Sequence, residues 1–316
     1  MIFKPRYETE ELKVLRSLYK RSNLTDKEVN YYLNLEKGFS GEQQFDSLTE
    51  KLTEDYIVLN DLLLESNNTV FQIDTLLISK EKIYFFEVKN YEGDFYIESE
   101  RWYSITRTEI KNPLLQLNRS GSLLRRLLQE LGWNFTIESY LVFINPDFYL
   151  YQTPLNLPII FPGQIKRFFN NNNNVELSKL NDKHIKFAKQ LLSRHLEDSP
   201  YKRVPEYNYE QLHKGIICVN CHSLLVDINV ATFRERTLVC SKCSCRERIE
   251  SAVIRSVEEF NLVGVGIRIA LLVTVFDFFR SFGHQTALLV TVFYFSRDYG
   301  HQIALSTKLY AFTYKF

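Results

Sequence analysis

The chain has 316 residues, 45% of them hydrophobic and 24% charged, and this composition excludes a disordered chain. Lys and Arg number 39 against 38 Asp and Glu, so the net charge is +1 and bulk charge gives no support to nucleic-acid binding. Any phosphate contact must then come from local basic groups, for which a solvated helix face is the favoured alternative. The candidates are Arg119, Arg125, Arg126, Lys166 and Arg167.

The amino terminus carries no pattern of a secretory signal, because charged residues rather than an apolar stretch follow Met1–Arg6. A cytoplasmic location is therefore the expectation. In that reducing compartment the five cysteines are expected to be thiols or metal ligands rather than disulfides.

Helical spacing of apolar residues predicts helices over 8–22, 27–35 and 41–52, followed by a strand over 56–64. Two apolar runs, 70–78 and 82–89, then surround a short polar turn and predict a β-hairpin.

The hairpin brings acidic residues together. If Ile78 pairs with Ile83, Asp74 lies directly opposite Glu87, and opposed Cβ atoms in an antiparallel pair are about 4.5–5.5 Å apart. Two carboxylates at that separation can share one hard divalent cation. Lys89 points to the same face as Glu87, where an ammonium can orient a water or stabilise charge developing on a phosphate.

An ordinary cross-strand ion pair is the alternative interpretation of these residues. The segment 83–86 is apolar on both faces, however, which indicates a central, covered strand. Acidic groups on such a strand are unfavourable unless they are paired or bound to a metal, so the catalytic interpretation is favoured.

Further strands are predicted over 95–98, 101–106, 137–144 and 159–161, and further helices over 112–131, 163–170 and 183–196. The low-complexity run 170–174 is expected to be a loop. These elements together predict an α/β fold in which helices flank a mixed sheet.

The order of several short motifs resembles the nuclease-related domain (NERD) family, a branch of the PD-(D/E)XK nuclease-like superfamily, over about residues 38 to 155. The motifs are Gly38-Phe39-Ser40-Gly41-Glu42, Gln72-Ile73-Asp74, Phe86-Glu87-Val88-Lys89, Gly93 and Asn112-Pro113-Leu114-Leu115-Gln116.

The resemblance implies a restriction-endonuclease-like fold and a site that binds Mg²⁺ or Mn²⁺. Asp74 and Glu87 would hold the metal, and Glu42 would complete the ligand set directly or through water. Lys89 would position the attacking water or stabilise the transition state, and Gln116 would orient the water or Lys89.

Two Cys-x-x-Cys pairs separated by 18 residues predict a second module. Cys218, Cys221, Cys240 and Cys243 at this spacing are typical of a tetrahedral zinc site, which is structural because four sulfurs close it. Cys245 is left over; it could replace Cys243 as a ligand or be a free thiol. His222 is not expected to be a ligand.

The ribbon hairpin of this module is predicted over 223–230 and 234–239, with a packed helix over 247–261. We hypothesise that basic residues on the ribbon help to position DNA. These residues are Arg234, Arg236, Lys242, Arg246 and Arg248.

The last fifty residues contain a duplication, since 270–285 and 287–302 match at most positions. Three interpretations are open: a pair of strands joined near Gly283, a membrane-surface or partner-binding segment, or an aberrant terminus from a duplication in the gene. The last is favoured because the tail breaks with the pattern of the rest of the chain. Its apolar runs are too short to span a bilayer as helices.

The predicted organisation has five parts: an N-terminal helical segment (1–37), a nuclease-like α/β domain (38–198), a linker (199–214), the zinc module (215–262) and the tail (263–316). The predicted function is metal-dependent hydrolysis of phosphodiesters in DNA. The alternative is a non-catalytic nucleic-acid-binding or regulatory module that keeps the fold. A third is a membrane-tethered or partner-binding protein, although membrane attachment is not expected, and neither is a small-molecule cofactor.

Overall fold

The computed structural model describes residues 1–52, 56–172, 180–197, 199–224 and 237–263 and, for the backbone alone, three strands of the tail. The chain forms two compact units, one of residues 1–8 and 33–202 and one of residues 9–32 and 203–316. The predicted domain boundaries stay a prediction.

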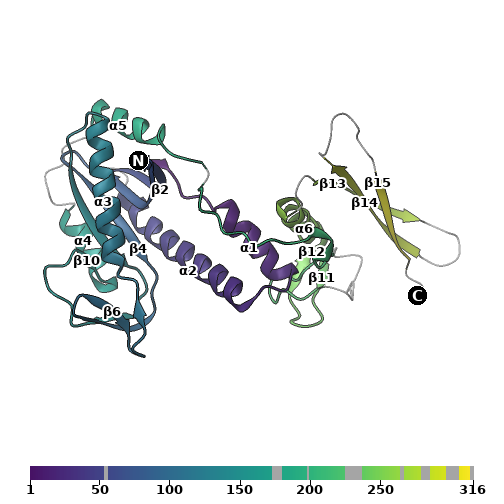
Figure 1. Ribbon diagram of the computed structural model, residues 1–316. Helices are drawn as coiled ribbons and strands as arrows, with labels where there is room; N and C mark the ends of the chain where they lie inside the picture. The colour runs from purple at the N-terminus through teal and green to yellow at the C-terminus, as the bar shows by residue number, and fades with distance from the viewer. Residues whose placement is uncertain are drawn as a thin grey trace. The chain divides into compact units, whose positions relative to one another are not determined.

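The first unit is built on a six-stranded sheet (Figure 1). Its strands, in spatial order, are β1 (Ile2–Lys4), β2 (Ile57–Ser66), β3 (Thr69–Ile78), β4 (Lys82–Lys89), β8 (Thr136–Phe143) and β10 (Ile159–Ile160). The pairs β2–β3 and β3–β4 are antiparallel, whereas β1–β2, β4–β8 and β8–β10 are parallel. The predicted mixed sheet is thus confirmed.

Helices cover both faces of this sheet. On one face, Phe45 of α2 (Asp26–Thr49) and Ile165 of α4 (Ile165–Asn172) share a buried cluster with Phe86. On the other, α3 (Pro113–Glu130) and α5 (Asp182–Leu192) pack on the strand residues that alternate with these, including Phe85. A strand with apolar side chains on both faces needs cover on both, and β4 receives it.

A second, four-stranded sheet lies in the same unit. It consists of β5 (Gly93–Glu98), β6 (Arg101–Ser104), β7 (Glu109–Ile110) and β9 (Phe148–Tyr151) in the order β7-β6-β5-β9. Its inner side chains, among them the buried Trp102, join the core cluster on the α3 side of the large sheet. The strand β9 is absent from the sequence prediction. A short turn of helix, Pro162–Gln164, precedes α4.

Both helices predicted over 27–35 and 41–52 are present but joined, because α2 runs unbroken through both and is followed by one tighter turn, Glu50–Leu52. Gly41 lies inside the helix rather than at a break. A Cβ there would lie 2.5 Å from the Cβ of Asn90, the residue after β4. Glycine therefore serves the close approach of α2 to the end of β4.

The second unit contains α1 (Glu10–Arg21), α6 (Ile249–Val263) and a two-stranded ribbon, β11 (Thr237–Val239) with β12 (Arg246–Arg248). Arg21 is fully buried and binds Glu259 of α6, with Nη2 to Oε2 at 2.6 Å. A short helical turn, Tyr209–Gln211, lies within the predicted linker, before the cysteines. Most of the predicted ribbon hairpin, residues 225–236, lies outside the described residues.

The tail forms an antiparallel sheet of β13 (Ile267–Phe278), β14 (Gln285–Ser296) and β15 (Ser306–Thr313). This backbone agrees with the strand interpretation, although Gly283 lies outside the described residues. Among the helices that the structure describes, none is long and apolar enough to cross a membrane.

Candidate metal-binding active site

The β3–β4 hairpin has the register that the sequence predicts. Ile78 pairs with Ile83, and the ladder continues to Thr75 and Phe86. Asp74 and Glu87 are the next residues along. Here the Asp74 side chain takes over the pairing, because the main-chain N–H of Val88 donates to Asp74 Oδ2 at 2.7 Å. Asp74 is thereby held against the end of β4, beside Glu87.

Glu87, Lys89 and Gln116 form a hydrogen-bonded group. Lys89 Nζ lies 2.7 Å from Glu87 Oε1 and 3.2 Å from Gln116 Oε1. Gln116 is in the first turn of α3, whose start is fixed by Asn112 Oδ1 accepting from the N–H of Leu114 and by Pro113. The structure therefore brings these three predicted site residues together.

Glu42 reaches the same region from α2 and meets a residue that the sequence did not point to. Arg6, which follows β1, donates to Glu42 Oε2, to Asp46 Oδ2 at 2.9 Å and to the main-chain oxygen of Asp74 at 2.6 Å. Asp46 follows Glu42 by four residues, which places both acids on the same face of the helix. This spacing is visible in the sequence and could have indicated that Asp46 belongs to the site. Arg6 has no such local signal, because its partners are distant in sequence.

Burial and mutual repulsion shift the pKa values of these acids upward. Burial, with Asp74 adding to it, raises the pKa of Glu87 to about 8, and the same two causes raise the pKa of Glu42 to about 8. Burial also raises the pKa of Asp74. Burial alone would lower the pKa of Lys89, but Glu87 and Asp74 outweigh it and raise the pKa. Glu42 and Glu87 therefore keep their protons at neutral pH unless a cation takes the place of those protons.

The donor set fits a divalent cation. Glu87 is 1% exposed, and its Oε2 is a buried oxygen without a hydrogen-bond partner in the described part of the chain. A buried carboxylate oxygen is unfavourable without a partner. Four carboxylates (Glu42, Asp46, Asp74, Glu87) face two cations (Arg6, Lys89), and hard oxygen ligands suit Mg²⁺ or Mn²⁺.

Comparison with known proteins agrees with this geometry. Residues 37–144 match the nuclease-related domain. Over this segment the chain is similar to the NERD family. No curated protein matches the chain, and no solved structure does. The NERD match includes all five predicted site residues but not Arg6. It suggests a nuclease-related function, dependence on a divalent metal and interaction with nucleic acid.

Outside the NERD domain, four cysteines form a second candidate metal site. The Sγ atoms of Cys218, Cys221, Cys240 and Cys243 all lie within 4.8 Å of one another. Two of the pairs, Cys218 with Cys243 and Cys221 with Cys240, are 3.6 Å apart. Tetrahedral zinc with Zn–S bonds of about 2.3 Å requires sulfurs about 3.8 Å apart, so the cluster fits zinc.

The two cysteine turns are built alike. The N–H of His222 donates to the oxygen of Cys218, and the N–H of Ser244 donates to the oxygen of Cys240. His222 and Ser244 both have positive φ, 57° and 59°. In the second turn Cys245 supplies only its main-chain oxygen, to the N–H of Cys240, and its sulfur lies outside the four-cysteine cluster.

The sulfurs differ in acidity. Hydrogen bonds from Ser223 lower the pKa of Cys221 and bring the pKa of Cys240 to about 6. Burial raises the pKa of Cys218 to about 12. Zinc binds thiolates, so the thiol of Cys218 has to lose its proton when zinc binds.

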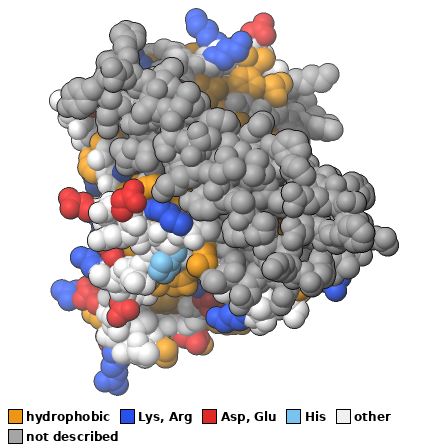
Figure 2. All heavy atoms as spheres, turned by 90° about the vertical axis from the view of Figure 1, so that its right-hand side faces the viewer, with side chains coloured by type: hydrophobic (Ala, Val, Ile, Leu, Met, Phe, Trp, Pro, Cys, Tyr) orange, Lys and Arg blue, Asp and Glu red, His pale blue; other side chains and the backbone are white. Residues whose placement is uncertain are grey.

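The basic residues singled out from the sequence are all exposed where the structure describes them. This holds for the candidates on α3 and α4 and for three on the ribbon, whereas Arg234 and Arg236 lie outside the described residues. The described side chains on the face shown in Figure 2 mix basic and acidic groups. Local contacts, rather than one broad basic field, are what this surface offers to phosphates.

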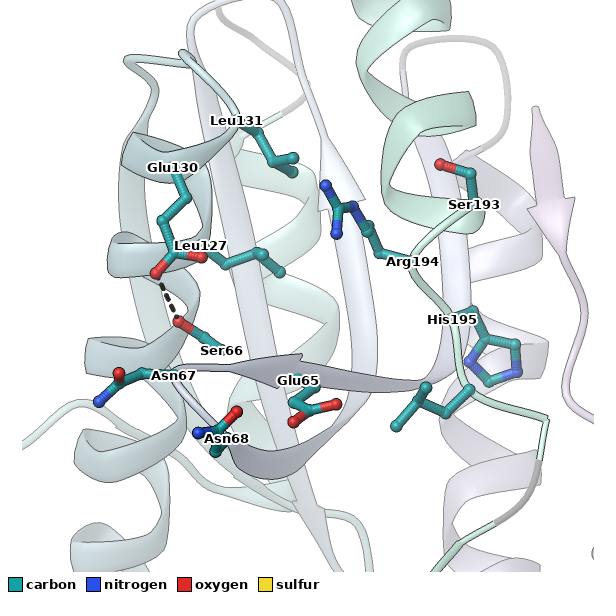
Figure 3. A pocket seen from close by; sticks show the side chains of 11 residues that line it. Glu65, Ser66, Asn67, Asn68, Leu127, Glu130, Leu131, Ser193, Arg194 and His195 are labelled. Atoms are coloured by element: carbon teal, nitrogen blue, oxygen red, sulfur yellow. Dashed lines mark hydrogen bonds between the residues drawn. The ribbon is translucent and has the colours of Figure 1, made fainter.

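A cavity of about 390 Å³ opens beside the turn between β2 and β3, away from the acidic cluster. Figure 3 shows its lining, where Ser66 donates to Glu130 and Arg194 points inward. His195 accepts the N–H of Leu63 through Nδ1. None of the five predicted site residues lines this cavity, and its mixed charges suggest no catalytic group.

Proposed function

We propose that this protein is a metal-dependent nuclease that hydrolyses phosphodiester bonds in DNA. The observation that carries the proposal is the buried Oε2 of Glu87 beside Asp74, which has no hydrogen-bond partner in the described part of the chain and lies within an acidic cluster that Lys89 borders. A NERD domain over these residues supports the same function.

The roles follow from the contacts. Asp74 and Glu87 would hold Mg²⁺ or Mn²⁺, with Glu42 completing the ligand set directly or through water. The bound ion supplies a more acidic water and offsets charge on the phosphate. Lys89 positions the attacking water or stabilises the charge that develops in the transition state. Gln116, within 3.2 Å of Lys89, orients that ammonium or the water.

The four-cysteine cluster binds structural Zn²⁺ in this proposal, and the ribbon of β11 and β12, whose connection carries Cys240 and Cys243, helps to hold DNA. Lys242, Arg246 and Arg248 are exposed around β12 and available to phosphates. Replacing Arg246 and Arg248 with Glu should weaken DNA binding measured by fluorescence anisotropy and make it less dependent on salt. Unchanged affinity of a variant that retains zinc would remove the ribbon from the binding surface.

The experiment that tests the proposal is cleavage of DNA by the full chain with its zinc retained. Supercoiled, linear and single-stranded DNA are offered with Mg²⁺, with Mn²⁺ or without added metal, beside the Glu87→Gln variant. Cutting that needs the metal and disappears in Glu87→Gln is expected. Cutting that survives in this variant would place the activity elsewhere.

A non-catalytic nucleic-acid-binding or regulatory module is the second candidate. It is favoured by one contact, because Lys89 and Glu87 lie 2.7 Å apart as a structural ion pair would. The Lys89→Ala variant distinguishes the two candidate functions. A binding module keeps its affinity for DNA and its function without that ammonium, whereas a nuclease loses turnover.

A further inference from the structure

Arg6 occupies one half of the acidic cluster. Its side chain is 3% exposed. The guanidinium donates to carboxylate oxygens of Glu42 and Asp46 on α2 and to the main-chain oxygen of Asp74 on β3. An arginine with this many acceptors in place is a fixed cation rather than a surface charge.

The other half of the cluster is arranged differently. Asp74 Oδ2 accepts from the main chain of Val88, and Glu87 Oε1 accepts from Lys89. Glu87 Oε2 is the buried oxygen that the described residues leave without a partner. The coordination that a metal ion could satisfy is therefore on the side of Glu87, while the side of Glu42 and Asp46 already has its cation.

Charge limits the cluster in the same way. When all four are ionised, the carboxylates of Glu42, Asp46, Asp74 and Glu87 exceed the charges of Arg6 and Lys89 by two, which one divalent ion balances. A second divalent ion near Glu42 and Asp46 would lie beside the buried guanidinium, and repulsion between unscreened like charges is strong.

We infer that Arg6 acts as the resident cation of the Glu42–Asp46 pair and limits this site to a single divalent ion, held between Asp74 and Glu87 and reached by Glu42 through water. This inference rests on the proposed function, whose metal site it refines. Arg6 is then a positioning residue: it ties the helix that carries Glu42 to the strand that carries Asp74. It does so from outside the NERD match.

The test counts Mn²⁺ ions bound to the full chain with its zinc retained, by electron paramagnetic resonance of free Mn²⁺ during titration. Ions that are lost when Glu42 and Glu87 are both replaced by Gln are counted as ions of the site. The wild type is expected to bind one, and Arg6→Gln is expected to bind a second because Glu42 and Asp46 are freed. Arg6→Lys, which keeps the charge, is expected to stay at one.

Arg107→Gln is the matched control, because Arg107 is exposed in the turn before β7, and it should also bind one ion. Two site ions in the wild type would overturn the inference and leave the proposed function standing. A folded Arg6→Gln protein that still binds one Mn²⁺ ion at the site would also overturn the inference and leave the proposed function standing. A wild type that binds no Mn²⁺ would overturn both. The wild-type count decides even if Arg6→Gln fails to fold.

Discussion

The carboxylate of Asp74 accepts the main-chain N–H of Val88 at 2.7 Å, so a side chain takes the place of the carbonyl that would continue the β3–β4 ladder. This contact places a carboxylate at the end of the hairpin, where the candidate metal site lies. It holds Asp74 beside Glu87, whose Oε2 is a buried oxygen with no hydrogen-bond partner among the described residues.

Removing the Lys89 ammonium should lower turnover more than substrate binding. For Lys89→Ala we expect kcat to fall by about 10²–10³-fold with KM little changed, which is the usual effect of losing one group that stabilises charge in the transition state. Initial rates of DNA cleavage at saturating Mg²⁺ measure this. Lys82→Ala, at the other end of β4, is the control. A loss confined to KM would make Lys89 a substrate-binding residue.

The stability of the protein without added divalent metal should fall as the pH rises. The folded-state pKa values of Glu42 and Glu87 are raised from 4.5 to about 8, so the folded state binds more protons than the unfolded state between these values. Their contribution is fully present below about pH 4.5 and is lost as the pH rises through about 8. Thermal melts across this range should show the decline, and Glu87→Gln should reduce it.

Added Mg²⁺ should reverse that decline. Because the ion replaces protons on the acids, the rise in Tm is expected to be larger at about pH 8 than at about pH 6. Glu87→Gln should show little rise at either pH. An equal rise in both proteins would mean that Mg²⁺ stabilises the chain at some other place.

Gly41→Ala should destabilise the protein, whereas Gly38→Ala should not. A Cβ at Gly41 would overlap the Cβ of Asn90, while one at Gly38 meets nothing within 4 Å. The expected loss is about 1–3 kcal/mol in the free energy of unfolding for Gly41→Ala, against a gain of about 0.5–1 kcal/mol for Gly38→Ala. Urea unfolding of the two variants measures both. Similar free energies of unfolding for the two variants would contradict the close approach of α2 to Asn90.

Gly41→Ala should also reduce activity, because Asn90 directly follows Lys89 and its Nδ2 donates to the oxygen of Lys37 on α2. A shift of α2 at this contact would move the end of β4. Cleavage by Gly38→Ala at the wild-type rate is the matched comparison. Wild-type activity in Gly41→Ala would show that the site tolerates the shift.

Cys240→Ser should lose zinc, and Cys245→Ser should keep it. Of these two cysteines, Cys240 belongs to the cluster of four sulfurs and Cys245 does not. Cys245 contributes a main-chain oxygen to this turn, and serine has the same oxygen. Zinc content of the purified proteins, measured by mass spectrometry of the metal, is expected to be one ion per chain in the wild type and in Cys245→Ser. Loss of zinc in Cys245→Ser, with zinc retained in Cys240→Ser, would mean that Cys245 rather than Cys240 is a zinc ligand.

Local patterns in the sequence predicted the parts of the site that local geometry determines. The register of the β3–β4 hairpin follows from its turn and from apolar alternation, and it is confirmed. The four-cysteine cluster follows from spacing alone. Asn112 and Pro113 likewise marked the start of α3, which places Gln116.

Contacts between distant segments were not predictable in this way. Arg6 meets residues 36 to 69 positions away, so no periodicity points to it. The predicted second helix begins at Gly41, whereas Gly41 lies inside α2, and only the packing against Asn90 explains its place. The buried pair of Arg21 and Glu259 spans 238 positions, and it joins α1 to the unit with the cysteines, although the sequence placed α1 in a separate segment.

The most direct test of the account is the rate of DNA cleavage by the zinc-retaining full chain as Mn²⁺ is titrated, measured in parallel with Glu87→Gln. The account predicts a rate that is zero without the ion, saturates with the occupancy of one Mn²⁺ site and is abolished in Glu87→Gln. A folded wild type that binds Mn²⁺ and DNA but cuts no substrate would contradict it and favour a binding module.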